Sequence, residues 1–351
     1  MFFSKKKDLI GIDIGSSSVK LMQLKEHKGV YQLLNVGIVP LPPEAIVDNT
    51  LMDSSSVVEA VKSLVKSLDV KVKEVACSIS GNTVIIRKIK LPAMPADELE
   101  DQIQWEAEQY IPFDINDVNI DFQILEPDEE DPSRMDVLLV ASKKEIVNDY
   151  VNVFTEAGLK LMVVDVDSFA VQNAFELNYE AGPEEVVALI NIGANVLNLN
   201  IVKGGISLFT RDVQMGGNLF TEEIQKQLGL SSDEAEQVKI TGNYPDKGRL
   251  QDVIAKVNET LAIEMRRSLD FYNTTAGEGK IGKVYLSGGA AKTSSLSEVV
   301  QNKLGLPVEM MDPLRKIVSS EKEFDPEYLR EIGPFVTVAV GLATRRVGDK
   351  W

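Results

Sequence analysis

The stretch Asp8-Leu-Ile-Gly-Ile-Asp-Ile-Gly-Ser-Ser-Ser-Val-Lys-Leu21 decides the fold that this sequence predicts. Its apolar run carries one carboxylate, Asp13, and ends at Gly15, and three serines then lead into an alternating segment. This pattern predicts two buried strands joined by a tight turn. Backbone N–H groups in such a turn can bind phosphate, Asp13 can hold a hydrated Mg²⁺, and Lys20 supplies a countercharge. The predicted phosphate contacts are Gly15, Ser16, Ser17, Ser18 and Lys20.

The second half of the chain opens with the same layout, Glu185-Val-Val-Ala-Leu-Ile-Asn-Ile-Gly-Ala-Asn-Val-Leu-Asn-Leu199. Ile12-Asp13-Ile14-Gly15 corresponds to Ile190-Asn191-Ile192-Gly193, and each stretch continues through a second turn into another strand. Two hairpin units of matching order predict a duplicated domain, although two unrelated hairpins would give the same pattern. In a duplicated domain the two turns would hold a polyphosphate from both sides, with Gly193 and Ala194 on the second side.

Composition restricts the classes of function. The chain has 351 residues, of which 44% are hydrophobic and 26% charged, as is usual for a globular protein with one bilobed core or two domains. Its one cysteine, Cys77, fits a reducing compartment. Its one histidine, His27, excludes a histidine-based catalytic triad and a multi-histidine metal site. The sequence shows neither an apolar run of about 18 residues nor a signal peptide, so we expect a cytoplasmic protein.

The charge of the chain is unevenly distributed. The formal net charge is −17, and the run from Asp97 to Asp131 holds 14 Asp or Glu and no Lys or Arg. This balance argues against binding to nucleic acid and against direct insertion into or adsorption on an anionic membrane. It suits a basic partner segment, although a solvated acidic face would have the same composition.

Hydrophobic periodicity predicts the elements between the two hairpins. A helix should begin near Ser54, which can cap it, and strands should follow at 74–80 and 84–91. The block 88–165 has the pattern of two helices and about three strands, which predicts an inserted α+β subdomain. A connecting helix at 168–177 should then lead back to the duplicated core.

After the second hairpin, a polar stretch at 231–249 precedes a long helix, and 281–286 is a buried strand. That strand runs into Ser287-Gly-Gly-Ala290, where glycines would let a flat ring lie against bare backbone. A close-packed helix of small residues is predicted near 335–343.

Four motifs in this order resemble those of the actin/Hsp70/sugar-kinase superfamily. They are Asp13-Ile-Gly-Ser-Ser-Ser-Val-Lys20, Ile192-Gly193, Leu286-Ser-Gly-Gly-Ala290 and the helix at 339–343. The resemblance implies an α/β, actin-like (ribonuclease H-like) fold of two lobes with ATP or ADP and Mg²⁺ between them. The further nucleotide contacts that it implies are Gly216 and Gly217 beside the phosphates, Gly288, Gly289 and Ala290 against the adenine, and Glu264 and Arg267 near the ribose or base.

Within that superfamily, the inserted subdomain resembles the PilM family of type IV pilus assembly proteins, on Gln109-Tyr-Ile-Pro-Phe113 and Val140-Ala-Ser-Lys-Lys-Glu145. Its arrangement is also similar to that of the bacterial division protein FtsA. FtsA carries a C-terminal amphipathic membrane helix, and Arg345–Trp351 shows no such pattern, which favours the PilM family.

The resemblance implies an ATP-binding scaffold of type IV pilus or related type II secretion machinery. Such a scaffold would be held at the inner membrane by the cytoplasmic tail of a PilN-like protein. A pilus motor ATPase or platform protein, and a second copy of the chain, remain further candidate partners.

The resemblance divides the chain into lobes and subdomains. The implied parts are 1–87 (first lobe), 88–165 (inserted FtsA-like subdomain), 166–184 (connecting helix), 185–220 and 281–332 (second lobe), 221–280 (its outer subdomain) and 333–351 (C-terminal helix returning to the first lobe).

One position departs from the superfamily pattern. Asn191 stands where the second phosphate motif normally has Asp, and an amide can bind Mg²⁺ through water but is a poor base. Gln172 falls where actin-like enzymes keep a water-positioning residue, although an ordinary helix-surface glutamine would look the same. With Asp13, these are the candidate catalytic residues, so we expect slow or negligible hydrolysis.

Two other functions stay open at this point. A small-molecule kinase of the same fold would need a base, for which Asp165 and Asp167 are the candidates. A filament-forming protein like FtsA or MreB is the second alternative. For a partner tail bound between the inserted subdomain and the first lobe, the candidate anchors are Trp105, Tyr110, Ile111 and Phe113, for which core packing is an equally good interpretation.

Overall fold

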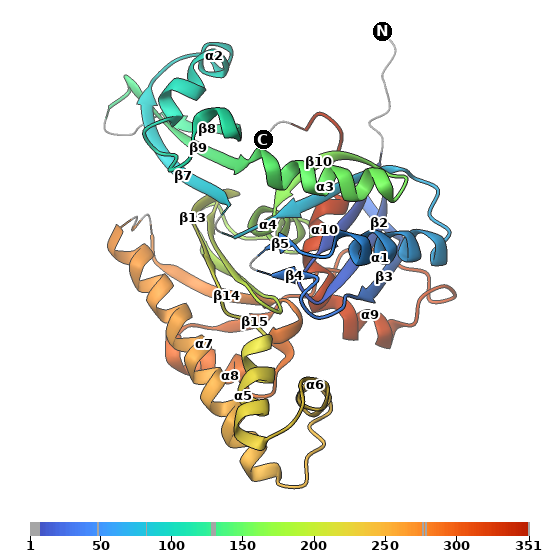
Figure 1. The fold of residues 1–351 in the computed structure, drawn as a ribbon. Helices are drawn as coiled ribbons and strands as arrows, with labels where there is room; N and C mark the ends of the chain where they lie inside the picture. Colours follow the sequence, from blue (N-terminus) through green and yellow to red (C-terminus); the bar gives the residue numbers. More distant parts are fainter. Residues whose placement is uncertain are drawn as a thin grey trace.

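Each predicted hairpin opens a five-stranded mixed sheet in the computed structural model (Figure 1). The structure describes residues 8–47, 49–81, 83–127, 131–275, 277 and 279–349. The first sheet has the order β3-β2-β1-β6-β10 and the second the order β13-β12-β11-β14-β15. In both sheets the first three strands pair antiparallel and the last two join in parallel, so the predicted duplication is present strand by strand.

The hairpin strands and the strands predicted at 74–80 and 281–286 lie close to their predicted bounds. No bounds were predicted for the strands at 160–166 and 308–310. The strands of each sheet have the following bounds. In the first sheet they are β1 (Ile10–Ile14), β2 (Ser18–His27), β3 (Val30–Pro40), β6 (Glu74–Ile79) and β10 (Lys160–Val166). In the second they are β11 (Val186–Ile192), β12 (Leu197–Lys203), β13 (Ile206–Val213), β14 (Ile281–Ser287) and β15 (Val308–Met310). All five residues of β1 are buried because helices cover both faces of its sheet.

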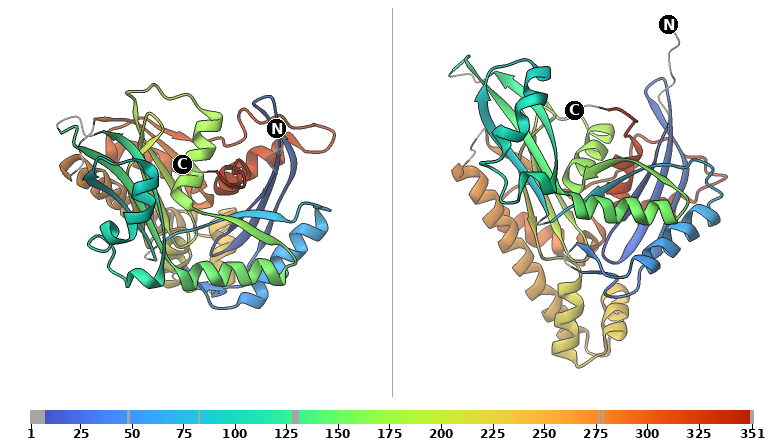
Figure 2. Two further views of the ribbon diagram at one scale, coloured as in Figure 1. Left: turned by 90° about the horizontal axis from the view of Figure 1, so that it is seen from above. Right: turned by 45° about the horizontal axis from the view of Figure 1, so that its top comes forward.

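The helices and sheets alternate in layers, as Figures 1 and 2 show. Helices α4 (Asp167–Asn178) and α10 (Thr337–Ala343) lie between the two sheets and pack on each other. Helices α1 (Ser54–Ser67) and α3 (Lys144–Glu156) cover the outer face of the first sheet. The long helix α7 (Lys247–Thr275) and α8 (Leu296–Leu304) cover the outer face of the second. The central helices contact strands of both sheets, α10 with β1 and β2 and α4 with β11 and β12.

A separate small sheet stands out from the first lobe (Figure 1). Its order is β7-β9-β8, and with one helix it forms what we call the inserted module, residues 84–143. Its elements are β7 (Val84–Pro92), α2 (Ala96–Ala107), β8 (Val118–Pro127) and β9 (Arg134–Lys143). Helix α2 buries Leu99, Ile103 and Ala107 against the sheet, so the module has a core of its own. The Lys143 N–H donates to the Thr83 carbonyl at 3.4 Å, which places the entry and exit of the module side by side.

Two elements of the predicted inserted block pack elsewhere. Strand β10 pairs with β6 in the first sheet, and α3 contacts α1 on the outer face of that sheet. Alternation and helical periodicity identify a strand or helix but not the sheet that it joins, which is why 88–165 was the expected block. Both elements also have counterparts in the second lobe, β15 and α8. The other predicted domain limits stay predictions.

Two local expectations were wrong. The predicted polar stretch at 231–249 contains a helix, α6 (Ser232–Thr241), which follows α5 (Asn218–Leu228). A capping box begins α6, in which the Ser231 side chain and that of Glu234 bind each other's backbone N–H groups. Helix α1 is capped by Asp53, whose carboxylate accepts the Ser56 N–H at 3.1 Å, and not by Ser54.

Among the described residues, none of the helices is long and apolar enough to cross a bilayer.

Candidate functional site

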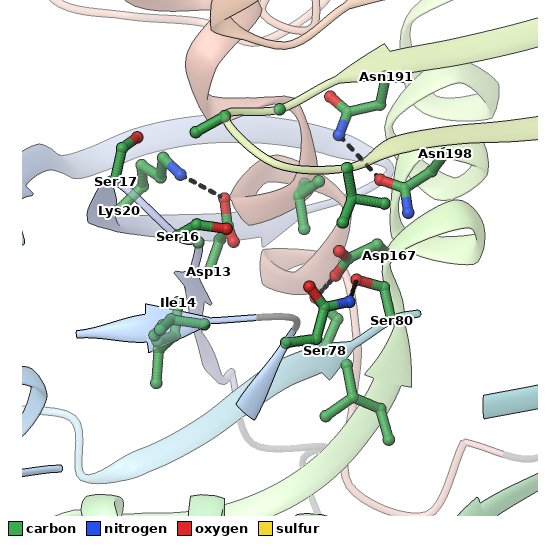
Figure 3. A pocket seen from close by; sticks show the side chains of 18 of the residues that line it. Asp13, Ile14, Ser16, Ser17, Lys20, Ser78, Ser80, Asp167, Asn191 and Asn198 are labelled. Carbon is green, nitrogen blue, oxygen red and sulfur yellow. Dashed lines mark hydrogen bonds and ion pairs between the residues drawn. The ribbon is translucent and has the colours of Figure 1, made fainter. Parts of the chain in front are cut away.

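The two predicted turns lie on opposite sides of one cavity between the lobes (Figure 3). In the first turn the Gly15 N–H donates to the Ser18 carbonyl at 3.1 Å. In the second the Gly193 N–H donates to the Val196 carbonyl at 2.9 Å. The same hydrogen bond therefore closes both turns, and Gly15 and Gly193 both line the cavity. The structure brings the two halves of the predicted phosphate site together.

An ion pair lies on the first side of this cavity. Lys20 Nζ is 3.1 Å from Asp13 Oδ2, because the two residues are direct cross-strand partners on β1 and β2. Their side chains are only 11% and 12% exposed. Removing one member of such a poorly hydrated pair leaves the other charge uncompensated, which typically costs about 3–5 kcal/mol when the pair is fully buried. Ser16 and Ser17 also line the cavity beside the pair.

A row of polar side chains occupies the second side. Asn191 pairs across the strands with Asn198, as Asp13 does with Lys20, so the duplicated unit keeps the spacing but replaces charge by amide. Asn191 Nδ2 donates to Asn198 Oδ1 at 3.2 Å, and Asn198 Nδ2 donates to Asp212 Oδ1 at 2.8 Å. Ser287 Oγ donates to Asn191 Oδ1 at 3.2 Å.

Glycine is required where α5 meets the second turn. The Gly217 N–H donates to the Gly193 carbonyl at 2.9 Å, and the Asn218 N–H donates to the Ala194 carbonyl at 2.8 Å. A Cβ at Gly216 would lie 2.5 Å from both carbonyl oxygens of that turn, closer than any side chain permits. Gly216 therefore lets the start of α5 rest on the turn and fixes the shape of the turn.

A larger cavity continues from the two turns and has a volume of ≈ 390 Å³, within the range of small-molecule sites. It shares Asp13, Lys20 and Gly193 with the first cavity. The predicted adenine contacts Gly288, Gly289 and Ala290 line it, as do Gly217 and Ser18. Gly288 has φ +87°, and a Cβ there would overlap the backbone of Ile192, so the end of β14 must remain bare.

Two predicted ribose or base contacts are not at this cavity. Glu264 of α7 pairs with Arg211 at 2.9 Å and with Arg267 at 3.3 Å, and none of the described residues that line the two cavities belongs to α7. The lining residues in their place are Glu236 and Lys239 of α6. The Ser-x-x-Glu signal that starts α6 was visible in the sequence and would have revealed this helix.

Gln172 is also held away from the two turns. Its side-chain amide donates to the Gly205 carbonyl and to Glu176, both at 2.8 Å, and accepts from Asn200 at 3.0 Å. Gln172 is not among the residues that line either inter-lobe cavity. The α4 residue that lines the cavity is Asp167, which sequence reasoning considered only as a kinase base.

Asp167 has an environment unusual for a carboxylate. Burial raises its pKa to about 7, with the charge of Asp13 adding to the rise, while hydrogen bonds from Ser78 and Ser80 oppose it. The Ser78 hydroxyl donates to Asp167 Oδ1 at 2.6 Å (Figure 3). Asp165 is also buried, which raises its pKa to about 6, and it pairs with Arg345 at 3.3 Å. A buried carboxyl poised near neutrality beside a cavity is the usual environment of a functional group.

A comparison with known families identifies the chain. The family described as type IV pilus assembly protein PilM matches residues 11–347. The chain belongs to the PilM family. A solved structure described as a PilM-PilN type IV pilus biogenesis complex contains a chain 31% identical to this one, with a TM-score of 0.87, and the match covers 97% of this chain and 98% of that one.

A more distant relative and a protein of similar fold extend the comparison. Cell division protein FtsA of Bacillus subtilis (strain 168) is 22% identical over 253 residues, which are 66% of this chain but 57% of that protein. MreB5 of Spiroplasma citri, in a crystal structure bound to ADP, is 13% identical with a TM-score of 0.50 and covers 93% of this chain and 98% of that one. The predicted actin-like fold and the PilM-family resemblance are thus both confirmed.

The residues of this PilM-family chain fit a nucleotide with Mg²⁺. The two glycine turns, the bare end of β14 and the Lys20 charge suit a polyphosphate joined to a flat ring. The described residues contain no group of three or more His, Cys, Asp or Glu placed to hold a metal. Mg²⁺ that enters through phosphate oxygens and water needs only one or two protein carboxylates, and Asp13 is placed to be one.

The four predicted partner anchors differ sharply in exposure. Ile111 is 6% exposed and belongs to the core of the inserted module, against which Tyr110 and Phe113 pack half-buried. Trp105, on α2, is 83% exposed. Of these four side chains, only Trp105 is available as an anchor without repacking the module.

The pKa of Asp167 gives a prediction for stability. Between about pH 4 and about pH 7 the folded protein keeps a proton at Asp167 that the unfolded chain has released. This carboxyl therefore makes the free energy of unfolding fall as the pH rises through that range. We expect Asp167→Asn to reduce the fall by about 1–4 kcal/mol, measured by urea unfolding from about pH 4.5 to about pH 8.

The control for this measurement is Asp252→Asn, at an exposed position of α7. It should leave the pH dependence as in the parent. If the Asp167→Asn curve runs parallel to the parent curve, Asp167 is ionised in the folded protein across this range and the raised pKa is wrong.

Proposed function

We propose that this chain is a nucleotide-binding scaffold of type IV pilus assembly that binds ATP or ADP with Mg²⁺ and a PilN-like cytoplasmic tail. The observation that carries the nucleotide part is the pair of turns with matching hydrogen bonds on opposite sides of one cavity. The ADP-bound MreB5 structure of related fold supports it. Membership of the PilM family and the likeness to a PilM-PilN complex support the partner.

The proposed nucleotide contacts follow the lining of the cavity. The phosphates would be held by the turn at Gly15 to Ser18 with Lys20 on one side and by Gly193 and Ala194 on the other. Asp13 would hold Mg²⁺, and Asn191 would contribute through a water molecule. The adenine would lie against Gly288 to Ala290. Glu236 and Lys239 replace Glu264 and Arg267 as the groups that we propose for the ribose or base.

The proposed partner surface lies on the inserted module. The acidic run from Asp97 to Asp131 includes α2, so the exposed Trp105 stands on a helix rich in carboxylates. A membrane protein's cytoplasmic tail is rich in Lys and Arg near the bilayer. Acidic groups would steer such a tail and reject anionic headgroups, and an aromatic anchor would supply affinity. The chain would thereby sit at the cytoplasmic face of the inner membrane through its partner.

Two titrations test the proposal separately. The purified chain is titrated by calorimetry with ATP in the presence and absence of Mg²⁺, and then with a synthetic peptide of a PilN-type cytoplasmic tail. We expect both to bind. Failure to bind ATP refutes the nucleotide part, and failure to bind the peptide refutes the partner part. A pull-down from membranes with and without ATP shows whether a motor ATPase, a platform protein or a second copy of the chain joins them.

We expect turnover to be slow, because Asn191 brings no charge to the second phosphate turn. The rate of phosphate release should lie far below about 1 s⁻¹. A carboxylate at 191 alone would face the carbonyl oxygen of Asn198, because Asn198 donates its amide N–H to Asp212. The informative variant is therefore Asn191→Asp combined with Asp212→Asn. In it the Asn198 amide can reverse, so that it donates to the carboxylate at position 191 and accepts from the amide at position 212.

This double variant should release phosphate at least several times faster than the parent. Asp212→Asn alone is its matched control and should not be faster. A parent that already hydrolyses ATP rapidly would refute slow turnover, and a phosphorylated small-molecule product would support the kinase alternative.

A further inference from the structure

One hydrogen bond joins the two lobes directly beside the nucleotide cavity. Asp212 Oδ2, near the end of β13 in the second lobe, accepts the Gly81 N–H of the first lobe at 2.6 Å. Gly81 lies between β6, which belongs to the first sheet, and β7, which belongs to the inserted module. The contact therefore links the second lobe to the segment through which the chain enters that module.

The backbone at Gly81 is fixed in a form that only glycine adopts readily. Its φ is +85°, and a Cβ there would overlap the side chain of Asn49, which itself donates to Ser80 Oγ at 3.2 Å. Ser78, on the same segment, donates to Asp167. This segment is thus held by a carboxylate on each side, Asp167 of α4 and Asp212 of β13.

Asp212 also ends the row of polar side chains that crosses the second sheet. Ser287, Asn191, Asn198 and Asp212 are consecutive cross-strand partners on β14, β11, β12 and β13. Each side chain is hydrogen-bonded to the next, at 3.2, 3.2 and 2.8 Å in that order. The row runs without a break from the end of β14, across the strand ends that flank the second turn, to the inter-lobe contact.

The chemistry of Asp212 sets the direction of every hydrogen bond in this row. Both Asp212 oxygens accept hydrogen bonds, from the Gly81 N–H and from Asn198 Nδ2, so Asn198 turns its N–H group toward Asp212 and its oxygen toward Asn191. Asn191 must then turn its N–H group toward Asn198 and its oxygen toward Ser287, whose hydroxyl donates. The orientation of the Asn191 amide beside the cavity is therefore determined two strands away.

We propose that Asp212 is a positioning residue with two linked effects. It orients the amides of Asn198 and Asn191 for the phosphates and the hydrated Mg²⁺, and it holds the entry segment of the inserted module against the second lobe. The first effect rests on the proposed nucleotide binding, and the second does not. Separation of the lobes breaks the Gly81 contact, so the nucleotide cavity and the inserted module share one hydrogen-bonded element.

The first test needs no nucleotide. Hydrogen exchange at the Gly81 amide is measured in the parent, in Asp212→Ala and in the control Asp252→Ala, at an exposed position of α7. We expect exchange to be at least about tenfold faster in Asp212→Ala and unchanged in the control, because the amide loses its acceptor. Unchanged exchange in Asp212→Ala overturns the inter-lobe effect even if the chain binds no ATP.

The second test first reverses the orientation of the Asn191 amide and then restores it. In Asp212→Asn the new amide can still accept from Gly81 only if it presents N–H to Asn198, which reverses the amides of Asn198 and Asn191. We expect the Mg²⁺-dependent affinity for ATP, measured by calorimetry, to fall about fivefold to tenfold. Asn198→Asp combined with Asp212→Asn reverses only the hydrogen bond between positions 198 and 212. The Asn191 amide still donates to position 198 and still accepts from Ser287, position 212 still accepts from Gly81, and the net charge is unchanged.

The double variant should therefore recover affinity to within about threefold of the parent. A residue that only stabilised the fold would not be rescued in this way, and unfolding curves for all variants show whether stability follows the same order. If the double variant binds as weakly as Asp212→Asn, or if Asp212→Asn binds like the parent, Asp212 does not position Asn191 and the proposal is overturned. If the parent binds no ATP, the proposed nucleotide function fails, and the exchange test alone decides the inter-lobe effect.

Discussion

Asp13→Ala should abolish the part of the ATP affinity that depends on Mg²⁺. In the proposed site Asp13 is the carboxylate beside the first turn, and its loss would remove a charged oxygen ligand of the metal while freeing Lys20 from its ion pair. We expect the affinity measured with Mg²⁺ to fall at least about tenfold, or 1.4 kcal/mol. The affinity measured in a chelator should stay the same or rise, because the free Lys20 ammonium attracts phosphate.

Calorimetry of the parent, Asp13→Ala and Asp13→Asn, each with Mg²⁺ and with a chelator, separates these effects. Asp13→Asn keeps the shape of the site but not its charge, and the control Asp252→Ala changes a charge at an exposed position of α7. If Asp13→Ala binds ATP with Mg²⁺ as tightly as the parent, Asp13 is not at the metal and the proposed site is wrong. A fall of equal size with and without Mg²⁺ would also refute the metal role.

The fold could be predicted because two hairpins with the same local sequence pattern occur in the chain. The hairpins at 8–21 and 185–199 each place a glycine turn between a buried run and an alternating strand, and both turns close with the same hydrogen bond. The sheet that each strand joins was harder to predict. Nothing local to β10 shows that it pairs with β6, because pairing over 80 residues depends on the tertiary fold and not on alternation.

The glycine turns of the candidate site could be predicted from local sequence. The side chains that helices of the second lobe contribute to the cavity were harder to predict. Gly15, Gly193 and Gly288 follow from turn chemistry, and all three line the inter-lobe cavities. Glu264 and Glu236 are both acidic residues on helices of the second lobe, and only the packing of α6 decides which one meets the cavity. The errors therefore lie where tertiary contacts decide.

The polar row across the second sheet was also predictable only in part, because tertiary contacts decide how far it extends. Asn191 and Asn198 are seven residues apart, as are Asp13 and Lys20, so the hairpin register was implicit in the sequence. The reach of the row to Asp212 and Gly81 was not, because it joins four strands and both lobes. Sequence reasoning treated Asn191 as a lost carboxylate, whereas in the structure its amide is the middle of a directed chain of hydrogen bonds.

Removal of the inserted module should abolish binding of a PilN-type tail and spare ATP. The module can be cut cleanly, because the Lys143 N–H meets the Thr83 carbonyl and a short Gly-Ser linker can replace residues 84–143. A longer cut at 88–164 would remove α3 and most of β10, which the core of the first lobe needs. We expect tail binding to fall below detection by calorimetry, at least about a hundredfold, while ATP affinity stays within about threefold of the parent.

A finer variant separates the aromatic anchor from the acidic surface that carries it. Trp105→Ala in the intact chain should weaken tail binding by about 2 kcal/mol or more, because an exposed tryptophan that becomes buried on binding is a typical hot spot. Gln104→Ala, at the neighbouring exposed position of α2, is its control.

Tail affinity should also weaken as the salt concentration rises, without vanishing, because each exposed charge pair contributes little to the affinity and mainly steers the encounter. If the tail binds the shortened chain as well as it binds the parent, the module is not the binding surface. If it binds Trp105→Ala normally yet loses all affinity in high salt, the acidic face alone binds it and the proposed anchor is wrong.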